Sequence, residues 1–375
     1  MTRPRWLSLK PVVPVHWDEI TPQWMTDAIS GRHPDARVDE VRLVASDQGA
    51  NRHARFALTY AQGSGPRGVF VKVHAPAHRW VHMRNGNLFW ETRLFASGMP
   101  VPVDHPLVYL SVPDYPRLNF LLVMEDLNLR GADCRDTTRP MTVEQAAAGL
   151  RGLARLHRHY WGMTTRSHPP LRWVKPWAAA EGWMTGLRHR IPTGLSRVQE
   201  HLPAPISDMS GERVADLWAR YVGTLMERDL TLLHGDAYIG NSYVLPDGEV
   251  GFLDWQAVRR GNWSQDVGYF IAGALTREDR RAHERHLLEI YRDALQLAQG
   301  PSADEVWRRY RQSHAYGLAI WLSALGTNGW QSRAVCEALV GRYAAAFVES
   351  DTPGALGEAP IERELWRRDD SRFRT

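Results

Sequence analysis

The alternation of apolar and polar residues predicts short strands early in the chain and helices in most of the rest. Three strand-like runs, separated by turn-forming Gly, Ser, Asp and Pro residues, are Val38 to Val44, Arg52 to Tyr60 and Val69 to His74. A continuous apolar run from Asn119 to Met124 predicts another strand, and helical spacing from Arg79 to Ser97 predicts a helix before it. The first third of the chain should therefore hold a small antiparallel sheet.

Helical periodicity dominates after residue 140. Thr142 and Gln145 form a capping box that opens a helix, and Thr21 followed by Pro22 gives a similar start near the N-terminus. Ser264 is expected to cap a later helix. Further helices are predicted roughly over residues 174–190, 211–228, 277–298, 302–325 and 332–349.

These patterns predict an α+β protein with two lobes. Residues 1–127 form a small lobe, an antiparallel sheet, and residues 141–350 form a larger, mainly helical lobe. The polar, turn-rich stretch 128–140 is the expected linker between them. Residues 351–375 are polar and contain Pro and Gly, as expected of a loosely docked tail.

Composition narrows the class of protein. The 375 residues are 43% hydrophobic and 23% charged, as in soluble globular proteins, and are enough for two lobes with their own cores. No run of 18 apolar residues predicts a membrane span, and prolines break the basic N-terminus, unlike a secretory signal. The cytoplasm is the expected compartment. Cys134 and Cys336 are expected to be reduced thiols.

Charge argues against a nucleic-acid partner. The net charge is +4, but the 46 Lys and Arg residues are interleaved with 42 Asp and Glu residues, and no basic block stands out. A mildly cationic enzyme that binds polyphosphate fits this pattern better. The sequence does not indicate the oligomeric state.

The strongest candidate for chemistry is the segment 231–255. A short apolar run leads to His234-Gly235-Asp236, and Asn241 follows five residues after Asp236. Two further short runs flank a Pro-Asp-Gly turn and end at Asp254, which predicts a hairpin that returns Asp254 beside Asp236 and Asn241. Each residue alone could be a turn former or a strand end. Together, two carboxylates and an amide oxygen suit Mg²⁺ bound with phosphates.

A second candidate is Lys72, which stands alone in the apolar strand Val69 to His74. A buried ammonium needs an anionic partner, and Glu91 in the predicted helix that follows can supply one. The alternative is a surface lysine and an unrelated glutamate. Given the segment downstream, the ion pair is the preferred interpretation.

HGDAYIGN followed by FLDWQ resembles the aminoglycoside phosphotransferase and choline kinase superfamily, whose fold is protein-kinase-like. LDWQ followed by WSQDVGYF is most similar to the ecdysteroid-kinase-like branch. The resemblance implies a kinase that uses ATP, or GTP, with Mg²⁺. In it Asp236 orients the acceptor hydroxyl, His234 braces the loop, Asn241 and Asp254 bind Mg²⁺, and Lys72 paired with Glu91 binds the phosphates. Gln256 departs from the Glu common in choline kinases, which argues against choline.

The resemblance also implies a nucleotide site. Gly49 and Asn51 lie where a phosphate-covering loop is expected, although a plain tight hairpin explains them equally well. Backbone groups of Glu125 and Leu127 would bind adenine at the hinge between lobes. Asp266 would accept hydrogen bonds from the backbone of the catalytic loop, or would simply favour the start of its helix.

The acceptor is expected to be a neutral or partly apolar molecule with a hydroxyl group. Residues 276–350 hold ten Arg against nine Asp and Glu, so no acidic surplus suited to a polycation is present. Six tryptophans lie where such enzymes build the acceptor site, although core packing could also use them: Trp161, Trp173, Trp177, Trp183, Trp321 and Trp330. Phosphorylation of an aminoglycoside or another antibiotic is the alternative.

Two alternatives come from other classes. A metal-dependent hydrolase could use His234, Asp236 and Asp254 as ligands, but would leave Lys72 and Glu91 unexplained. A kinase-shaped binding protein without activity is the other alternative, although Lys72, Asp236, Asn241 and Asp254 are all present in this chain.

Overall fold

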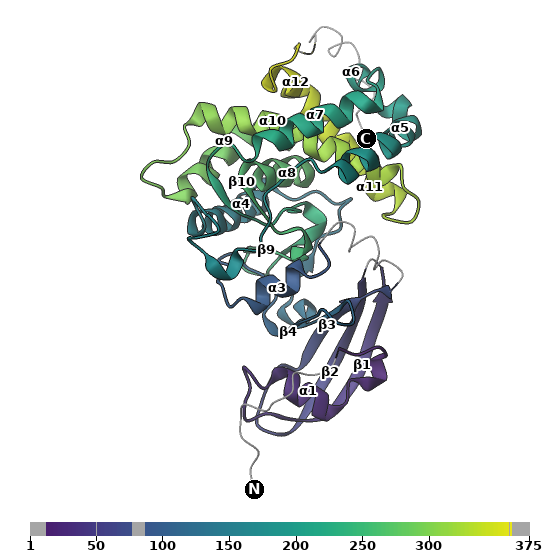
Figure 1. The fold of residues 1–375 in the computed structure, drawn as a ribbon, viewed down its shortest axis with the longest axis vertical. Coiled ribbons are helices and arrows are strands. Elements are labelled where there is room, and N and C mark those ends of the chain that lie inside the picture. The colour runs from purple at the N-terminus through teal and green to yellow at the C-terminus, as the bar shows by residue number, and fades with distance from the viewer. Residues whose placement is uncertain (1–12, 50, 77–86, 360, 362–375) are drawn as a thin grey trace. The chain divides into compact units, whose positions relative to one another are not determined.

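The computed structural model describes residues 13–49, 51–76, 87–359 and 361, and each of its two compact units is considered by itself. The first unit consists of Met1–Pro100, His105–Asp133 and Leu253–Ala257. The second consists of Val101–Asp104, Cys134–Phe252 and Val258–Thr375. Figure 1 labels the helices and strands of both. The division of the sequence into lobes at residues 127 and 141 stays a prediction.

The first unit is built on a five-stranded antiparallel sheet with the strand order β1-β2-β3-β5-β4. The strands are β1 (Arg37–Gln48), β2 (Asn51–Gln62), β3 (Gly68–His74), β4 (Val108–Asp114) and β5 (Asn119–Glu125). Four of them confirm predicted strands. Strand β4 was not predicted. It contains Pro113, a residue uncommon in strands, and buried residues do not alternate with exposed ones along it, since almost all are half-buried.

Two helices belong to this unit. Helix α1 (Pro22–Ile29) begins as predicted, with the Thr21 hydroxyl accepting a hydrogen bond from the Trp24 N–H at 3.2 Å. Its buried residues join those of the sheet in one hydrophobic core. Helix α3 (Trp90–Ala96) confirms the end of the helix predicted over residues 79–97. Residues 87–89 are described and are not helical, and residues 79–86 lie outside the described residues.

The second unit holds two small sheets that carry the candidate catalytic segment. Strand β7 (Leu230–Leu233) pairs antiparallel with β10 (Arg259–Asn262). Strands β6 (Asp133–Cys134), β8 (Ser242–Val244) and β9 (Val250–Phe252) form the other sheet, in the order β6-β8-β9. The hairpin predicted around the Pro-Asp-Gly turn is therefore confirmed as the β8–β9 pair.

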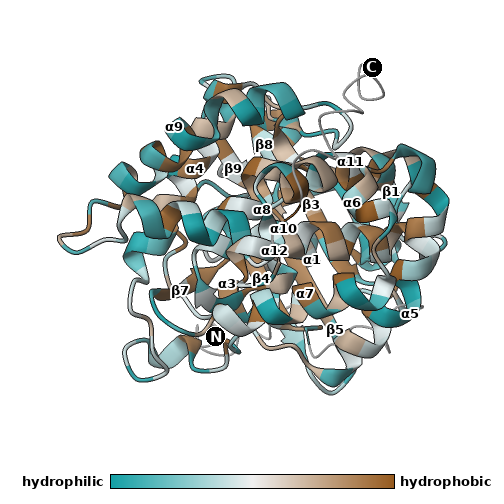
Figure 2. Ribbon diagram, turned by 90° about the horizontal axis from the view of Figure 1, so that it is seen from above, coloured by the Kyte–Doolittle hydropathy of each residue, from teal (hydrophilic) through white to brown (hydrophobic). Residues whose placement is uncertain are grey.

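Helices form most of the second unit. The long ones are α4 (Val143–His159), α5 (Glu181–Val198), α7 (Gly211–Thr224), α8 (Ser264–Ala274), α9 (Arg277–Leu295), α10 (Ala303–Leu325) and α11 (Arg333–Glu349), and the short ones are α6 (Ala204–Ser207) and α12 (Thr352–Ala355). Every residue of α8 is buried. A Cβ on Gly268 would lie 1.8 Å from the Ser313 hydroxyl of α10, so glycine allows these two helices to approach closely. In Figure 2 much of α9 is hydrophilic, as suits its exposed residues.

Two predicted helix starts are wrong. The helix expected from residue 174 begins at Glu181 and continues to Val198, with Pro192 inside it. Ser264 is the first residue of α8 rather than its cap, and its hydroxyl lies 3.2 Å from the Tyr221 hydroxyl. Sequence patterns predict that a helix is present more reliably than they predict its ends, because tertiary contacts determine where the first and last turns form.

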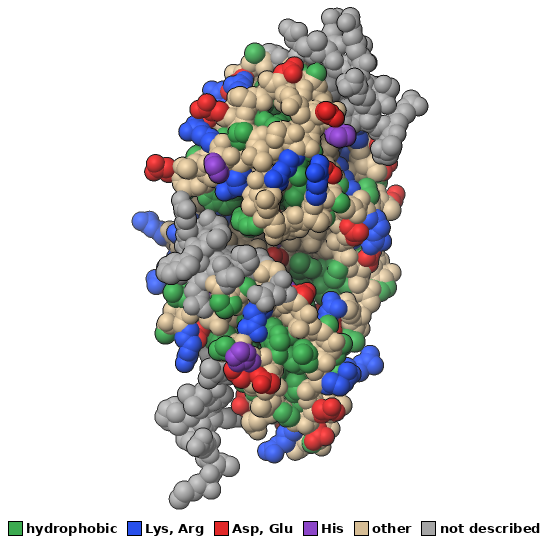
Figure 3. Space-filling model, turned by 90° about the vertical axis from the view of Figure 1, so that its right-hand side faces the viewer, with side chains coloured by type: hydrophobic (Ala, Val, Ile, Leu, Met, Phe, Trp, Pro, Cys, Tyr) green, Lys and Arg blue, Asp and Glu red, His purple; other side chains and the backbone are tan. Residues whose placement is uncertain are grey.

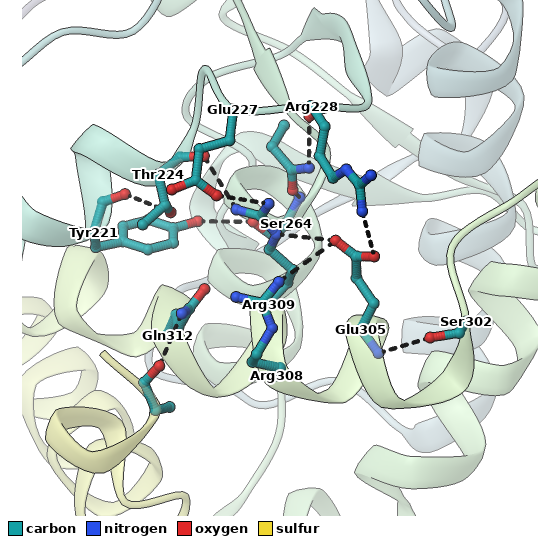
Figure 4. A network of polar contacts seen from close by, with 12 residues as sticks. Tyr221, Thr224, Glu227, Arg228, Ser264, Ser302, Glu305, Arg308, Arg309 and Gln312 are labelled. Carbon is teal, nitrogen blue, oxygen red and sulfur yellow. Dashed lines mark hydrogen bonds and ion pairs between the residues drawn. The ribbon is translucent and has the colours of Figure 1, made fainter. Parts of the chain in front are cut away.

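A polar network fixes the loop between α7 and β7 (Figure 4). Arg309 of α10 is 1% exposed and donates hydrogen bonds to the Thr224 carbonyl and to Glu227, each at 3.0 Å. The Asn262 side chain of β10 donates to the Arg228 carbonyl at 3.1 Å. Because buried charges must be paired, the network gives this loop one geometry, and β7 enters the site from a fixed position.

Acidic and basic side chains are interspersed on the face shown in Figure 3. In the part of the chain that the structure describes, no helix is both long enough and apolar enough to cross a membrane. Both cysteines are free thiols, as predicted.

Candidate active site

The loop after β7 places Asp236 in a defined backbone geometry. Gly235 has φ 83°, in the left-handed region that glycine adopts readily, so the chain turns sharply between His234 and Asp236. His234 is fully buried, and its ring nitrogen Nδ1 accepts a hydrogen bond from the Asp236 N–H at 3.2 Å. The predicted bracing role of His234 agrees with this contact.

Asn241 holds the Asp236 side chain. Its Nδ2 donates to the Asp236 carboxylate oxygen Oδ2 and to the Asp236 carbonyl, each at 3.0 Å. The 3₁₀ turn Ile239–Asn241 sets the spacing between these two residues. This orientation of the amide makes Oδ1 the Asn241 atom that could bind a cation.

Asp266 supports the same loop from helix α8. Its two carboxylate oxygens accept hydrogen bonds from the His234 N–H at 2.7 Å and the Gly235 N–H at 2.9 Å. Asp266 is fully buried, so these charge-assisted bonds are formed away from water. Of the two interpretations of Asp266, the contact with the loop backbone is the one present.

His157 is a supporting residue that the sequence did not identify as part of the site. It lies on α4, is fully buried, and its Nε2 lies 3.2 Å from the Asp266 carboxylate. Its Nδ1 lies 2.8 Å from the Tyr291 hydroxyl of α9. No local signal in the sequence could have shown that α4 and α9 meet behind Asp266.

In the first unit, Lys72 lies between two carboxylates. Its Nζ is 2.7 Å from Glu91 Oε2, which is the predicted ion pair, and 2.8 Å from Asp254 Oδ1. Lys72 and Glu91 are each about 5% exposed or less. The contact with Asp254 was not predicted.

Backbone contacts complete this cluster. The Trp255 N–H donates to Glu91 Oε1 at 3.1 Å, so both oxygens of Glu91 are used. Asp254 has φ 63°, which is uncommon for a residue other than glycine and is maintained here by the surrounding contacts. The Trp255 side chain is buried and packs in the core.

Burial and charge shift the pKa values in this cluster. Burial alone would lower the pKa of Lys72, but Asp254 and Glu91 outweigh burial and raise it. Burial raises the pKa of Glu91, and Lys72 partly offsets that shift. His53, paired with Lys72 across β2 and β3, has a lowered pKa because of burial and the Lys72 charge. The two carboxylates therefore favour the charged form of Lys72 within the sheet.

The other predicted nucleotide residues lie on the same sheet. Gly49 closes the β1–β2 hairpin, with its N–H bonded to the Asn51 carbonyl at 2.9 Å. Asn51 is 4% exposed, and its Oδ1 has no hydrogen-bond partner among the described residues. At the end of β5, the Glu125 N–H donates to the Leu107 carbonyl at 2.8 Å, so only the Glu125 carbonyl remains suited to contact a base. Leu127 begins the 3₁₀ turn that follows.

Aromatic residues surround Asp236 in the second unit. Burial and the Asp236 charge together raise the pKa values of Tyr269, Tyr316 and Tyr343. Of the six tryptophans predicted for the acceptor site, two contact the tyrosines around Asp236: Trp177 with Tyr316 and Trp321 with Tyr238.

The other four predicted tryptophans have different surroundings. Trp183 stacks on Trp218, with ring centroids 6.1 Å apart. Trp330 is 53% exposed and lies beneath the Arg190 guanidinium, whereas Trp161 and Trp173 are half-buried. Core packing or surface contacts therefore account for part of the predicted set.

The candidate ligands fit a hard cation better than zinc. The oxygens of Asn241 and Asp254 are the donors that Mg²⁺ prefers. Among the described residues, no group of three or more His, Cys, Asp or Glu side chains could hold a metal ion. The Nδ1 of His234 is already used by the Asp236 N–H, which does not favour His234 as a ligand.

Comparison with protein-family models finds one match. Residues 205–299, which include β7, the catalytic loop and α8, match the ecdysteroid kinase-like family. This match confirms the resemblance predicted from the same motifs. No curated protein sequence matches the chain.

Solved structures extend the comparison to nearly the whole chain. Spectinomycin phosphotransferase APH(9)-Ia, in complex with ADP and spectinomycin, has a TM-score of 0.52 and 11% identity, over 88% of this chain and 98% of that one. Macrolide 2'-phosphotransferase type I has a TM-score of 0.45 and 11% identity, over 87% of this chain and 97% of that one. Aminoglycoside phosphotransferase APH(3'')-Id from Streptomyces rimosus has a TM-score of 0.41 and 16% identity, over 78% and 97%.

The first of these comparisons confirms the predicted fold class, an α+β chain with a small antiparallel sheet and a larger helical region. The motif match covers the centre of the chain and the structural match covers most of it. The chain thus has the fold of a small-molecule phosphotransferase, and its central segment is similar to the ecdysteroid kinase-like family.

Proposed function

We propose that this protein is a small-molecule kinase that transfers the γ-phosphate of ATP, or of GTP, to a hydroxyl of a neutral or partly apolar molecule. The observation that carries the proposal is Lys72, a buried cation held at 2.7 Å by Glu91 and at 2.8 Å by Asp254. An ammonium fixed in this way is suited to neutralise phosphate oxygens, since it needs no further reorganisation when they bind.

Asp236 is the residue proposed to act on the acceptor. Its carboxylate accepts a hydrogen bond from the acceptor hydroxyl and aims the oxygen at the γ-phosphorus. The acceptor oxygen forms a bond to that phosphorus as the bond to the oxygen bridging the β-phosphate breaks. The hydroxyl proton passes to Asp236, and the products are a phosphate monoester and the nucleoside diphosphate. Asn241 and Asp266 support this role by fixing the carboxylate and the loop backbone.

Asn241 and Asp254 would hold Mg²⁺, which neutralises phosphate charge when bound. The course of the chain supports this pairing. Asn241 directly precedes Ser242, Ser242 pairs with Phe252 in the β8–β9 hairpin, and Asp254 is only two residues further on. In the nucleotide site, Gly49 and Asn51 would cover the phosphates.

Adenine recognition is assigned to the end of β5. Because the Glu125 N–H is bonded to Leu107, its carbonyl would accept from the base, and the Leu127 N–H would donate to it. These assignments predict that the purine base contributes binding free energy independently of the phosphate contacts of Lys72.

A screen of hydroxylated compounds tests the function. Purified protein is supplied with ATP and Mg²⁺, and ADP release is measured for each compound. Asp236→Asn should reduce the turnover number by about 10²–10⁴-fold with every accepted compound, the range typical of a positioned acid–base group. Asp247→Asn, in the exposed β8–β9 turn, is the control and should retain turnover. Turnover that is equal in Asp236→Asn and the parent would refute the assignment.

A further inference from the structure

Five aromatic rings form a continuous row in the second unit. Their order is Trp177, Tyr316, Tyr269, Tyr238 and Trp321, with successive ring centroids 5.5, 5.2, 6.0 and 5.1 Å apart. They come from the segment before α5, from α8 and α10, and from the catalytic loop itself. Tyr238, the fourth ring of the row, is only two residues from Asp236, the proposed catalytic carboxylate.

Several buried polar atoms of this row lack partners. Trp177 Nε1, Trp321 Nε1, the Tyr269 hydroxyl and Gln265 Oε1 have no hydrogen-bond partner among the described residues. Each of these side chains is more than nine-tenths buried. Buried polar groups are nearly always satisfied in native proteins, by the protein, by water or by a ligand. Two indole N–H donors and a phenol in one row therefore suit a ligand that carries oxygen acceptors.

The charges at the row exclude an acceptor with several ammonium groups. Arg259 of β10 lies over the Trp177 ring, with its guanidinium carbon 5.3 Å from the centroid. Burial lowers the pKa of Arg259 to about 10, although Tyr316 partly offsets this, so the guanidinium is a poorly hydrated cation. The carboxylates that act on the row tyrosines are those of Asp236 and Asp266, which already bond to Asn241 and to the loop amides.

We infer that the aromatic row and Arg259 form the acceptor site, and that it takes a flat, hydroxylated molecule that carries a carboxylate or carbonyl oxygen and no ammonium group. The inference rests on the proposed role of Asp236. The rings contact the flat body, the Trp177 indole N–H and Arg259 bind the oxygen group, and the hydroxyl lies at Asp236. Arg259 is a specificity residue that favours a carbonyl or carboxylate oxygen and repels an amine, so the neutral or partly apolar class proposed above is extended to acceptors with one negative charge.

Three matched probes test the charge preference: para-(hydroxymethyl)benzoate, its carboxamide and para-(hydroxymethyl)benzylamine. They share the ring and the hydroxyl and differ in charge. Binding is measured by ligand-observed NMR, with each probe titrated up to roughly ten millimolar so that weak binding is detected. ADP release is measured separately. The benzoate should bind at least about tenfold more tightly than the benzylamine, because it gains a charge-assisted hydrogen bond.

Variants assign the preference to Arg259. Arg259→Gln should weaken benzoate binding by about tenfold and leave the benzylamine unchanged or improved. Arg259→Lys should keep the preference because it keeps the charge. Arg285→Gln is the matched control, since the exposed Arg285 lies over Trp307 at 3.5 Å and Trp307 is nine residues before Tyr316 on α10. It should change neither affinity.

The outcomes separate the acceptor class from the kinase function. Benzylamine binding equal to benzoate, a preference unchanged in Arg259→Gln, or no binding by any probe would overturn the inferred acceptor class. ADP release with the benzylamine would do so while leaving the kinase proposal intact. A benzoate preference that depends on Arg259, without ADP release from any acceptor, would support the acceptor site and refute the kinase proposal.

Discussion

Replacing Asp266 with asparagine tests whether the candidate catalytic loop depends on a carboxylate behind it. In the parent, the two oxygens of Asp266 accept the N–H groups of His234 and Gly235 at 2.7 and 2.9 Å. Asparagine keeps one oxygen and turns an NH₂ group toward the other backbone N–H. Two donors then face each other in a fully buried site.

The expected loss of stability follows from these two bonds. A hydrogen bond to a charged group contributes about 1.5–3 kcal/mol and a neutral one about 1 kcal/mol, so the bond that remains loses roughly 1 kcal/mol. The other bond is lost, and leaving its N–H buried without a partner costs about 1–3 kcal/mol. Together the two losses should lower the free energy of unfolding of Asp266→Asn by about 2–4 kcal/mol, a large part of the 5–15 kcal/mol typical of a folded protein.

The loss of unfolding free energy is measured by urea denaturation, monitored by circular dichroism, from the transition midpoint and the slope m. Asp247→Asn is the control, because Asp247 accepts one N–H, from Glu249 at 3.0 Å, in an exposed turn. It should change stability by at most about 0.5 kcal/mol. Turnover, measured at a temperature at which both variants are folded, should fall only in Asp266→Asn.

Equal stability of the two variants would show that the loop amides find other acceptors and that Asp266 is not required to hold them. A loss of stability without a loss of turnover would support the stabilising role of Asp266. It would refute the claim that the loop geometry positions Asp236.

Three further predictions concern charge. Lys72→Ala should lower kcat/KM by about a hundredfold or more, mainly by raising the KM for the nucleotide. Replacement of the exposed Lys175 with alanine is the control and should leave kcat/KM unchanged. Equal kcat/KM values in the two variants would refute phosphate binding by Lys72. Asp254→Asn should weaken Mg²⁺–nucleotide binding, measured by calorimetry, whereas Asp236→Asn should bind normally; equal losses would indicate a shared metal cage. The pKa of His53 lies below its ordinary 6.5, so the unfolded chain takes up a proton first and stability is lost as pH falls through 6.5 toward the folded pKa. His53→Gln should remove this part of the pH dependence of the urea midpoint. If the midpoint of the variant depends on pH as in the parent, other groups cause the dependence.

The sequence predicted the parts of the site that are encoded locally. The turn at Gly235, the five-residue spacing from Asp236 to Asn241, and the Pro-Asp-Gly hairpin are all set by neighbouring residues. Lys72 was identified for a different reason. A lone lysine in an apolar strand needs a counter-charge, and the next helix offered Glu91.

Long-range packing explains what the sequence did not predict. Lys72 and Asp254 are 182 residues apart, and His157 and Asp266 are 109 apart. No periodicity connects such pairs, because their contact depends on how whole elements pack. Arg259 was missed for a similar reason. Nothing in the neighbouring sequence connects Arg259 with Trp177, and only the fold places that ring beneath it.

The first unit is built from separate segments of the chain, and this affects how it forms during biosynthesis. Leu253–Ala257 belongs to it, although 119 residues of chain (134–252) separate this segment from the rest of the unit. As the chain leaves the ribosome, the sheet that carries Lys72 is made long before Asp254 and Trp255, and until then Glu91 lacks the Trp255 N–H that it accepts in the finished protein. The first unit therefore cannot mature on its own as a nascent domain. Expression of residues 1–133 alone would leave Lys72 with one of its two carboxylate partners.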